Sequence, residues 1–424
     1  MADRVAPGMQ LDRLAAQLGA VLGVVPRRNA AADLVRTLYR LARDEKVLAV
    51  IDEFPYLLGT TAAEQQRTLT AIQAVMEEER EHSRLKLVLT GSTVAVMESL
   101  QAEHNPMHGR LLPMPVRPLN YRHAQEFLHD TSPVVRIARF SVAGGMPRYL
   151  SALADGSLLD AVTAQIVDPY APLFNEPSTL LAAELREPTV YFSILAALAR
   201  RPQTAADVGA TVHAPTQELT GYLHTLESLH LVSRHRPAGT DRPTRSTQWR
   251  CDDDFVRFWF RFVHPHRGAL ESGIDPRAFV GAQVAPHLGD HAAPTFERIL
   301  EDWVRAFHGA EAPGVGAWWG PALHPLRRTK QRFTEEIDCV AMRGRAVAVA
   351  AEAKWTTAPM GVDVLHDLFT YKLPAMAQAG HDVGDTHVVL ASRSGFTPGL
   401  VDAARGRSDV RLVDVETLSA DLRP

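Results

Sequence analysis

The sequence predicts a multidomain protein with α/β regions at both ends and helical regions between them. An apolar run of strand length, an amphipathic helix and a second apolar run follow one another over residues 47–92, an order that implies a parallel sheet. Residues 187–250 read as three helices followed by two strands, and residues 291–424 as helix, strand, strand, helix, strand, helix, strand. A chain of 424 residues has room for about two to four domains that each bury a core.

The composition excludes several classes of protein. Apolar residues make up 46% and charged residues 22%, as in ordinary globular proteins. No apolar run is long enough to span a bilayer and the start lacks the apolar core of a signal peptide, so we expect a cytoplasmic protein without a membrane partner. Two cysteines, Cys251 and Cys339, are too few for a disulfide scaffold or a structural zinc site. A net charge of −4 argues against coating nucleic acid through bulk positive charge.

The first elements follow from apolar spacing. Residues 8–43 read as two helices, and residues 62–84 as a third. The continuous apolar run over residues 47–51 is typical of a strand buried on both faces of a parallel sheet. LKLVLTGS, which ends at Ser92, is expected to be a second buried strand beside it.

From about residue 119 the pattern turns helical, and it becomes α/β again near the end. The expected domains are a partial α/β core over residues 1–118, a helical lid-like region over 119–186, a three-helix unit with a two-stranded ribbon over 187–252, a helical connector over 253–290 and an α/β domain over 291–424.

The run VLAVIDEF has the form of a Walker B strand, in which apolar residues are followed by two acids. A parallel strand would deliver Asp52 at its carboxyl end, where it can hold Mg²⁺ through water, and Glu53 could polarise an attacking water. Thr90 or Ser92 on the neighbouring strand could then sense a γ-phosphate. The alternative is a strand-end turn or a helix N-cap, where such acids are common.

A second acidic group is predicted near the other end. EIDCVAM, a turn and AVAVAAEAKW form a hairpin that carries Asp338, Glu352 and Lys354, and the last two lie on one face because they are two residues apart. Two carboxylates with a lysine could bind Mg²⁺ and activate water, which is the D…ExK arrangement of PD-(D/E)XK nucleases. Glu297 could supply a further acid from the preceding helix, with Glu301 as the fallback. The alternative is a buried hairpin that ends in a charged rim.

Helices near residues 189–199, 204–211 and 215–230, followed by two strands, match a winged helix-turn-helix. Thr216, Gln217 and Thr220 would face a DNA groove, while wing residues would hold phosphates. The wing residues are Arg234, His235, Arg236, Arg242, Arg245 and Arg250. The alternative is a wing packed as a structural element. A further basic group, Arg327, Arg328, Lys330 and Arg332, could contact a nucleic-acid backbone or form a solvated loop.

Several of these strings together closely resemble the archaeal-type ATPases of the AAA+/STAND group. They are IDEFPYLL, KLVLTGSTVAVMESL, HGRLLPMPVRPLNYRHAQEFL, VAGGMPRYL, LFNEPSTLLAAELREPTVYFSIL, CDDDFVRFWFRFVHPHR and EEIDCVAM…AEAKW. The resemblance covers nearly the whole chain and implies a P-loop ATPase core, a winged helix and a C-terminal region related to the PD-(D/E)XK nucleases. It also implies that Ser92 is the first sensor and that Arg110 and Arg148 contact phosphate, in cis or across a subunit contact. The alternative is that both arginines are ordinary surface residues or form structural salt bridges.

One element of that family pattern is missing. No G-x-x-x-x-G-K-[ST] string, whose backbone N–H groups and lysine cradle phosphates, occurs in the sequence. Either the sequence begins late or the domain has lost ATP binding. We therefore expect weak or no ATP hydrolysis, and a sheet without its usual central strand that exposes edges.

Three hypotheses remain. The first is an archaeal-type ATPase family member, linked to ATP, Mg²⁺ and double-stranded DNA, with a nuclease-like C-terminal domain and an incomplete ATP site. The second is an Mg²⁺-dependent DNA endonuclease with a regulatory N-terminal half. The third is a non-catalytic DNA-binding or toxin–antitoxin-like partner protein. If Arg110 and Arg148 act across a subunit contact, a further copy of the chain would be a partner.

Overall fold

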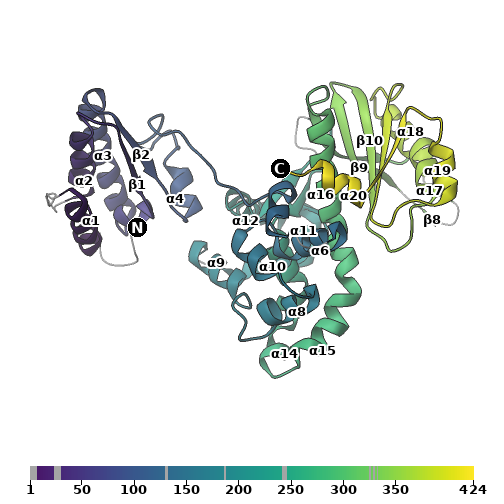
Figure 1. The fold of residues 1–424 in the computed structure, drawn as a ribbon, viewed down its shortest axis with the longest axis horizontal. Helices are drawn as coiled ribbons and strands as arrows, with labels where there is room; N and C mark the ends of the chain where they lie inside the picture. Colours follow the sequence, from purple (N-terminus) through teal and green to yellow (C-terminus); the bar gives the residue numbers. More distant parts are fainter. Residues whose placement is uncertain are drawn as a thin grey trace. The chain divides into compact units, whose positions relative to one another are not determined.

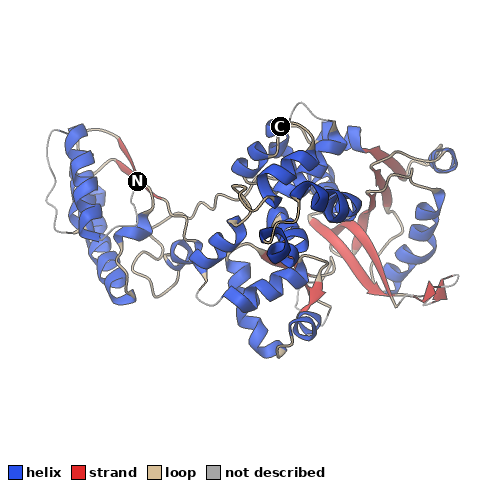
Figure 2. Cartoon of the chain, turned by 90° about the horizontal axis from the view of Figure 1, so that it is seen from below, coloured by secondary structure: helices blue, strands red, loops and turns tan. Residues whose placement is uncertain are grey.

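The computed structural model describes residues 7–22, 30–128, 132–185, 188–240, 246–323, 326–327, 330–331 and 333–424. The chain divides into two compact units, Met1–Val116 and Arg117–Pro424. Figure 1 labels the elements of each unit, and Figure 2 separates helices from strands by colour. Among the described helices, none combines the length and the apolar composition needed to cross a bilayer. The expected subdivision of the second unit into four domains stays a prediction.

The first unit has the expected helix and strand order. Its elements are α1 (Pro7–Leu22), α2 (Ala31–Leu41), β1 (Val47–Ile51), α3 (Ala62–Glu79), β2 (Leu85–Leu89) and α4 (Val94–Ser99), with short 3₁₀ turns at Phe54–Leu57 and Arg80–His82. A capping box starts α3, where the Glu64 N–H donates to the Thr61 hydroxyl. The two strands pair in parallel from Val47–Leu85 to Ile51–Leu89, as predicted.

The prediction that β1 is buried on both faces is wrong. Ile51 is buried and Val47 and Ala49 are half-buried, but Leu48 is 68% and Val50 58% exposed. The inward residues pack with α2 and α3 in one apolar cluster, whereas the alternate residues point to the opposite face of a two-stranded sheet. Helices thus cover one face only of this sheet within the described residues.

The second unit begins with short helices and then forms a three-helix group with a small sheet. The short helices are α5 (Tyr121–Ala124), α6 (Pro133–Ala143), α7 (Pro147–Ala152), α8 (Leu158–Val162) and α9 (Glu176–Glu184). The group contains α10 (Pro188–Leu198), α11 (Ala205–Val212), α12 (Thr216–Ser228), β4 (Val232–His235) and β5 (Gln248–Cys251). A two-residue strand that the sequence did not reveal, β3 (Gln203–Thr204), also pairs with β5, so the order is β3-β5-β4.

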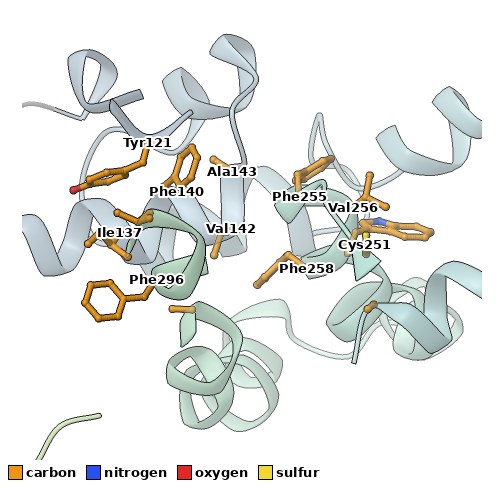
Figure 3. Packing of buried hydrophobic residues seen from close by; sticks show 14 of the residues in the cluster. Tyr121, Ile137, Phe140, Val142, Ala143, Cys251, Phe255, Val256, Phe258 and Phe296 are labelled. Atoms are coloured by element: carbon orange, nitrogen blue, oxygen red, sulfur yellow. The ribbon is translucent and has the colours of Figure 1, made fainter. Parts of the chain in front are cut away.

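An aromatic segment joins this group to the C-terminal part. It comprises α13 (Asp254–Phe258), a π-helical turn (Trp259–Val263), a 3₁₀ turn (His264–His266), α14 (Arg267–Glu271), α15 (Pro276–Phe279), a π-helical turn (Val280–Val284), a 3₁₀ turn (Ala285–His287) and α16 (Leu288–His308). Phe255 and Phe258 of α13 pack in one core cluster with Ile137 of α6 and Phe296 of α16. Figure 3 shows these side chains between the helices. This apolar cluster fixes α16 as the link between the helices and the C-terminal sheet.

The C-terminal sheet has five strands in the order β12-β11-β10-β9-β6. The elements after α16 are β6 (Gly314–Pro321), the short pair β7 (Leu326–Arg327) and β8 (Lys330–Gln331), β9 (Thr334–Arg343), β10 (Ala346–Lys354), α17 (Val362–Asp367), α18 (Leu373–Gln378), β11 (His387–Ser392), α19 (Pro398–Ala404), β12 (Val410–Asp414) and α20 (Val415–Asp421). The β9–β10 hairpin is antiparallel, and β11 and β12 add in parallel. The prediction omitted β6, whose three glycines weaken the strand pattern, and α20.

Helix α20 returns to the start of the same unit. The Tyr121 hydroxyl lies 2.9 Å from the Ser419 hydroxyl, and Ser419 also donates to Gln125 Oε1 at 2.8 Å. The Gln125 side-chain amide donates to the Leu422 carbonyl at 3.2 Å. These buried hydrogen bonds tie the last helix to α5 and the turn that follows it.

Candidate functional site

Two strands and one helix gather the acidic residues predicted near the C-terminus. In the β9–β10 hairpin the pair farthest from the turn is Cys339 with Ala351. Asp338 comes just before Cys339 on β9 and Glu352 just after Ala351 on β10, so both acids lie next to this pair. Lys354 ends β10 on the same side as Glu352, as the two-residue spacing requires. The hairpin therefore brings together the three residues that the sequence singled out.

A single ammonium group lies between the two carboxylates. Lys354 Nζ is 3.1 Å from Glu352 Oε2 and 3.6 Å from Asp338 Oδ2. The Ala353 N–H also donates to Asp338 Oδ2 at 2.9 Å, which holds that carboxylate against the end of β10. Burial alone would lower the pKa of Lys354, but Asp338 and then Glu352 raise it above its ordinary value. Lys354 therefore carries a positive charge between two acids.

Glu297 of α16, the acid predicted to join this pair from the preceding helix, lies near enough to Asp338 for the charge of that acid to act on it. Burial, then the charges of Asp338 and Glu336, raise the pKa of Glu297 to about 8. The fallback residue, Glu301, instead forms an ion pair with Arg305 at 2.6 Å one turn along the helix. The choice of Glu297 or Glu301 as the partner of the hairpin acids stays a prediction.

Lys372 is a residue of this group that sequence reasoning missed. It ends a π-helical turn (Leu368–Lys372) between α17 and α18, and its ammonium forms a short ion pair with Glu352 Oε1. Glu352 is 1% exposed, and each of its two oxygens contacts one lysine. Burial and the charge of Asp338 raise the pKa of Glu352, while Lys372 and Lys354 act in the opposite direction. No spacing rule links Lys372 to the ExK motif, so only the packing of the helix reveals it.

The oxygen donors suit a hard divalent cation, although they are not arranged as a finished site. Within the described residues, Asp338 Oδ1 and the Glu297 carboxyl have no hydrogen bond, so both are available as ligands. The same residues contain no group of three or more His, Cys, Asp or Glu side chains placed to hold a metal ion. Glu352 in particular would have to exchange a lysine for a metal.

The other predicted acids, Asp52 and Glu53, follow the carboxyl end of β1, next to the residues that follow β2. The Thr90 hydroxyl donates to Asp52 Oδ1 at 2.5 Å, and the Ser92 hydroxyl donates to Glu53 Oε2 at 3.1 Å. Two backbone hydrogen bonds connect the ends of the two strands. The Thr90 N–H donates to the Ile51 carbonyl, and the Phe54 N–H donates to the Thr90 carbonyl. Glu53 has a left-handed backbone with φ of 56°. Each acid is thus paired with a hydroxyl from the loop that follows β2.

The two arginines expected to contact phosphate are each paired with a glutamate. Arg110 forms a short ion pair with Glu77 near the end of α3. Arg148 of α7 lies 2.9 Å from Glu176 Oε1, and the Tyr149 hydroxyl donates to the same oxygen at 3.1 Å. Arg148 is 62% exposed in its side chain, so it could still turn toward a ligand. Contact of either arginine with phosphate stays a prediction.

The residues expected to contact nucleic acid have different surroundings. Arg234 pairs with Glu227 at 2.7 Å, and Arg250 pairs with Asp252 at 3.0 Å. Thr216, Gln217 and Thr220 are exposed on α12, whereas Leu219 on the same helix is buried. Arg242 and Arg245 lie outside the described residues, as do Arg328 and Arg332. For Arg327 and Lys330, the structure describes only the backbone of the β7–β8 pair.

A cavity of about 420 Å³ is lined in part by α16. It is bounded by residues 117–121, the Gly144-Gly145 turn, the end of β5 with Asp252, Asp253 and Asp254, and Arg298, Glu301 and Asp302 of α16. Burial is the first cause that raises the pKa of Asp253 to about 6, and it also raises the pKa of Asp302. The sequence string CDDD marked this region only as part of a resemblance.

Comparisons with known proteins find a family, a relative and a solved structure that resemble parts of the chain. Residues 259–363 match the family DUF234, described as archaea bacterial proteins of unknown function. An uncharacterized protein of Methanocaldococcus jannaschii, MJECL04, is 24% identical over 316 residues, which cover 73% of this chain and 67% of that protein. A solved structure, the Walker-type ATPase PABY2304 of Pyrococcus abyssi, aligns with a TM-score of 0.43 at 15% identity and covers 60% of this chain and 77% of its own. The first two findings place the chain near proteins of archaea and bacteria whose function is not described.

Proposed function

We propose that the chain is a nucleotide-linked DNA-processing protein whose C-terminal site hydrolyses phosphodiester bonds with a divalent cation. One observation supports this function most: Lys354 lies between Asp338 and Glu352, 3.6 Å from the first and 3.1 Å from the second. Carboxylates provide the oxygen ligands that Mg²⁺ prefers, and an ammonium beside them suits a phosphate or an attacking water.

The residues would divide the work as follows. Asp338 through Oδ1, Glu297 and, after release of a lysine, Glu352 would hold the Mg²⁺. The bound ion would supply Lewis-acid stabilisation of the phosphate charge. Lys354, which stays charged between the acids, would donate hydrogen bonds to the water or to a phosphate oxygen. The Ala353 N–H, which donates to Asp338 Oδ2, would keep that carboxylate in place.

The group formed by α10–α12 and β3-β5-β4 would place the DNA. Three helices followed by a β-ribbon are the order of a winged helix-turn-helix, in which the third helix lies in the major groove. The exposure of Thr216, Gln217 and Thr220 supports this assignment, because α12 keeps one polar face free while it buries Leu219. The ion pair of Arg234 with Glu227 would have to open for Arg234 to contact phosphate.

Nicking of supercoiled plasmid in Mg²⁺ or Mn²⁺ tests the proposed hydrolysis. Lys354→Met and Asp338→Asn should each lower the nicking rate at least about a hundredfold, the size expected for the loss of a group that acts on the reacting atoms. Glu416→Gln is the matched control, because Glu416 is an exposed acid of α20 in the same unit. Plasmid that stays supercoiled with every divalent metal tried would reject the nuclease function.

A second activity, nucleotide binding, is favoured by the two acid–hydroxyl pairs of the first unit. Asp52 and Glu53 would hold Mg²⁺ and orient water, and Ser92 would respond to the γ-phosphate. The absence of a G-x-x-x-x-G-K-[ST] string predicts weak affinity, since that loop supplies most phosphate contacts.

Titration with a fluorescent ATP analogue in the presence of Mg²⁺ tests this second activity. Asp52→Asn should abolish any measurable binding, whereas Asp44→Asn, which changes an exposed acid before β1, should leave it unchanged. Undetectable binding by the unmodified chain would reject nucleotide binding for this sequence.

A further inference from the structure

Lys372 is the least expected charge of the C-terminal site. It comes from the turn between α17 and α18, not from the hairpin that carries the acids. Its side chain is 12% exposed, and its ammonium contacts Glu352 Oε1, while Lys354 holds Oε2 of the same carboxylate. Glu352 therefore has an ammonium group on each oxygen.

This double contact leaves the two hairpin acids balanced without a metal. Asp338 and Glu352 face Lys354 and Lys372 at ion-pair distance, so two positive charges meet two negative ones. A carboxylate as buried as Glu352 needs such compensation, because an unpaired buried charge is strongly unfavourable. A divalent cation that approached Glu352 would meet an oxygen that already carries an ammonium group.

We propose that Lys372 acts as an internal cation that closes the metal position of this site, and that a divalent ion binds Glu352 only when the Lys372 ammonium leaves it. This inference rests on the proposed metal site at Asp338 and Glu352. Lys372 suits the role better than Lys354, since Lys354 also contacts Asp338 and so bridges both acids. Its four-carbon stem can swing the ammonium away while the backbone of the π-helical turn stays in place.

Removal of the Lys372 charge should therefore tighten metal binding. Lys372→Met keeps most of the side-chain volume, and we expect Mn²⁺ to bind at least about tenfold more tightly, as for the loss of one competing ion pair. Lys372→Arg keeps the positive charge and should bind Mn²⁺ as weakly as the unmodified chain. Adding Asp338→Asn to Lys372→Met should cancel the gain. The affinities come from Mn²⁺ calorimetry and from Tb³⁺ luminescence sensitised by Trp355, the residue after Lys354.

A measurement on the unmodified chain keeps the test valid if Lys372→Met does not fold. Saturating Mn²⁺ should raise the acetylation rate of Lys372 by acetic anhydride severalfold, relative to the exposed Lys86, as read by mass spectrometry. Unchanged acetylation would overturn the proposal. So would equal Mn²⁺ affinity in Lys372→Met and the unmodified chain, or a gain that survives Asp338→Asn.

These outcomes separate this inference from the proposed hydrolysis. Tighter Mn²⁺ binding by Lys372→Met without any plasmid nicking would support the role of Lys372 and reject the nuclease function. If Lys372→Met abolishes plasmid nicking without a gain in Mn²⁺ affinity, the nuclease function is supported and the role of Lys372 as an internal cation is rejected. Lys372 would then be a positioning residue for Glu352.

Discussion

Asp254 accepts a hydrogen bond of 2.7 Å from Arg257, three residues further along α13, and both side chains are almost fully buried. Asp254 also accepts from the Thr295 hydroxyl at 2.9 Å and forms a short ion pair with Arg298, both on α16. Burial alone would raise the pKa of Asp254, but Arg298 and Arg257 lower it below its ordinary value. One carboxylate thus joins the helical part of the second unit to the helix that carries Glu297.

Asp254→Asn should lower the free energy of unfolding of the second unit by about 3 kcal/mol, because it leaves two arginines without their buried partner. Tryptophan fluorescence during urea unfolding measures this, since all six tryptophans lie between residues 249 and 355. Asp302→Asn on α16 is the control and should not destabilise, because burial already raises the pKa of that acid. Equal losses in the two variants would contradict the special role of Asp254.

Asp253 should make the free energy of unfolding of the second unit fall as the pH rises. Its pKa is raised to about 6, mainly by burial, so the stability that it contributes in its protonated form is lost as the pH rises from about 4 through 6. Asp253→Asn cannot ionise but can still accept the hydrogen bond that caps α13 through the Val256 N–H. Relative to the unmodified chain, this variant should gain on the order of 2 kcal/mol between pH 4.5 and pH 7.5. Urea unfolding at the two pH values measures the gain, and a difference that does not change with pH would refute it.

Glu79 should hold the first unit together more than its neighbour does. Its side chain is almost buried at the end of α3, where Arg40 of α2 and Arg43, just after α2, contact its two oxygens at 3.0 and 2.6 Å. Glu79→Gln should cost on the order of 2 kcal/mol, since charge-assisted hydrogen bonds at low exposure are lost. Hydrogen exchange of the α2 and α3 peptides measures the change. Glu78→Gln, an exposed acid paired with Arg36, should leave exchange nearly unchanged, and a similar effect of both would argue against burial as the cause.

The uncovered face of β1 should control solubility and not stability. Leu48→Thr combined with Val50→Thr removes two exposed apolar side chains, so the concentration at which the chain aggregates should rise. The free energy of unfolding should change by less than about 0.5 kcal/mol. Light scattering and urea unfolding measure the two effects. Ile51→Ala, on the buried face, should instead cost on the order of 2 kcal/mol, and an equal loss in the threonine variant would show that the face is covered.

The sequence allowed local elements and short-range geometry to be predicted, but not which residues far apart in the sequence pack together. The helices and the paired strands of the first unit followed from apolar spacing, and the two-residue rule placed Glu352 beside Lys354. The burial of Val50 was predicted wrongly, because apolar composition does not say how many layers cover a sheet. Lys372 was missed because its contact with Glu352 depends on how a helix packs over the hairpin and not on any spacing along the chain.

The hydrogen bond between Tyr121 and Ser419 joins residues 298 positions apart, and this separation sets an order of events during synthesis. At about 5–20 residues per second, the ribosome needs roughly 15–60 s to reach α20 after Tyr121 has been made. Until then the polar groups of Tyr121, Gln125 and Arg136 lack their Ser419 partner, and this part of the nascent chain is open to chaperones and proteases. The first unit meets no such delay, because it lies within residues 1–116 and its hydrogen bonds, such as that of Ser83 with Tyr39, join residues only 44 positions apart. It can therefore fold while most of the second unit is still being translated.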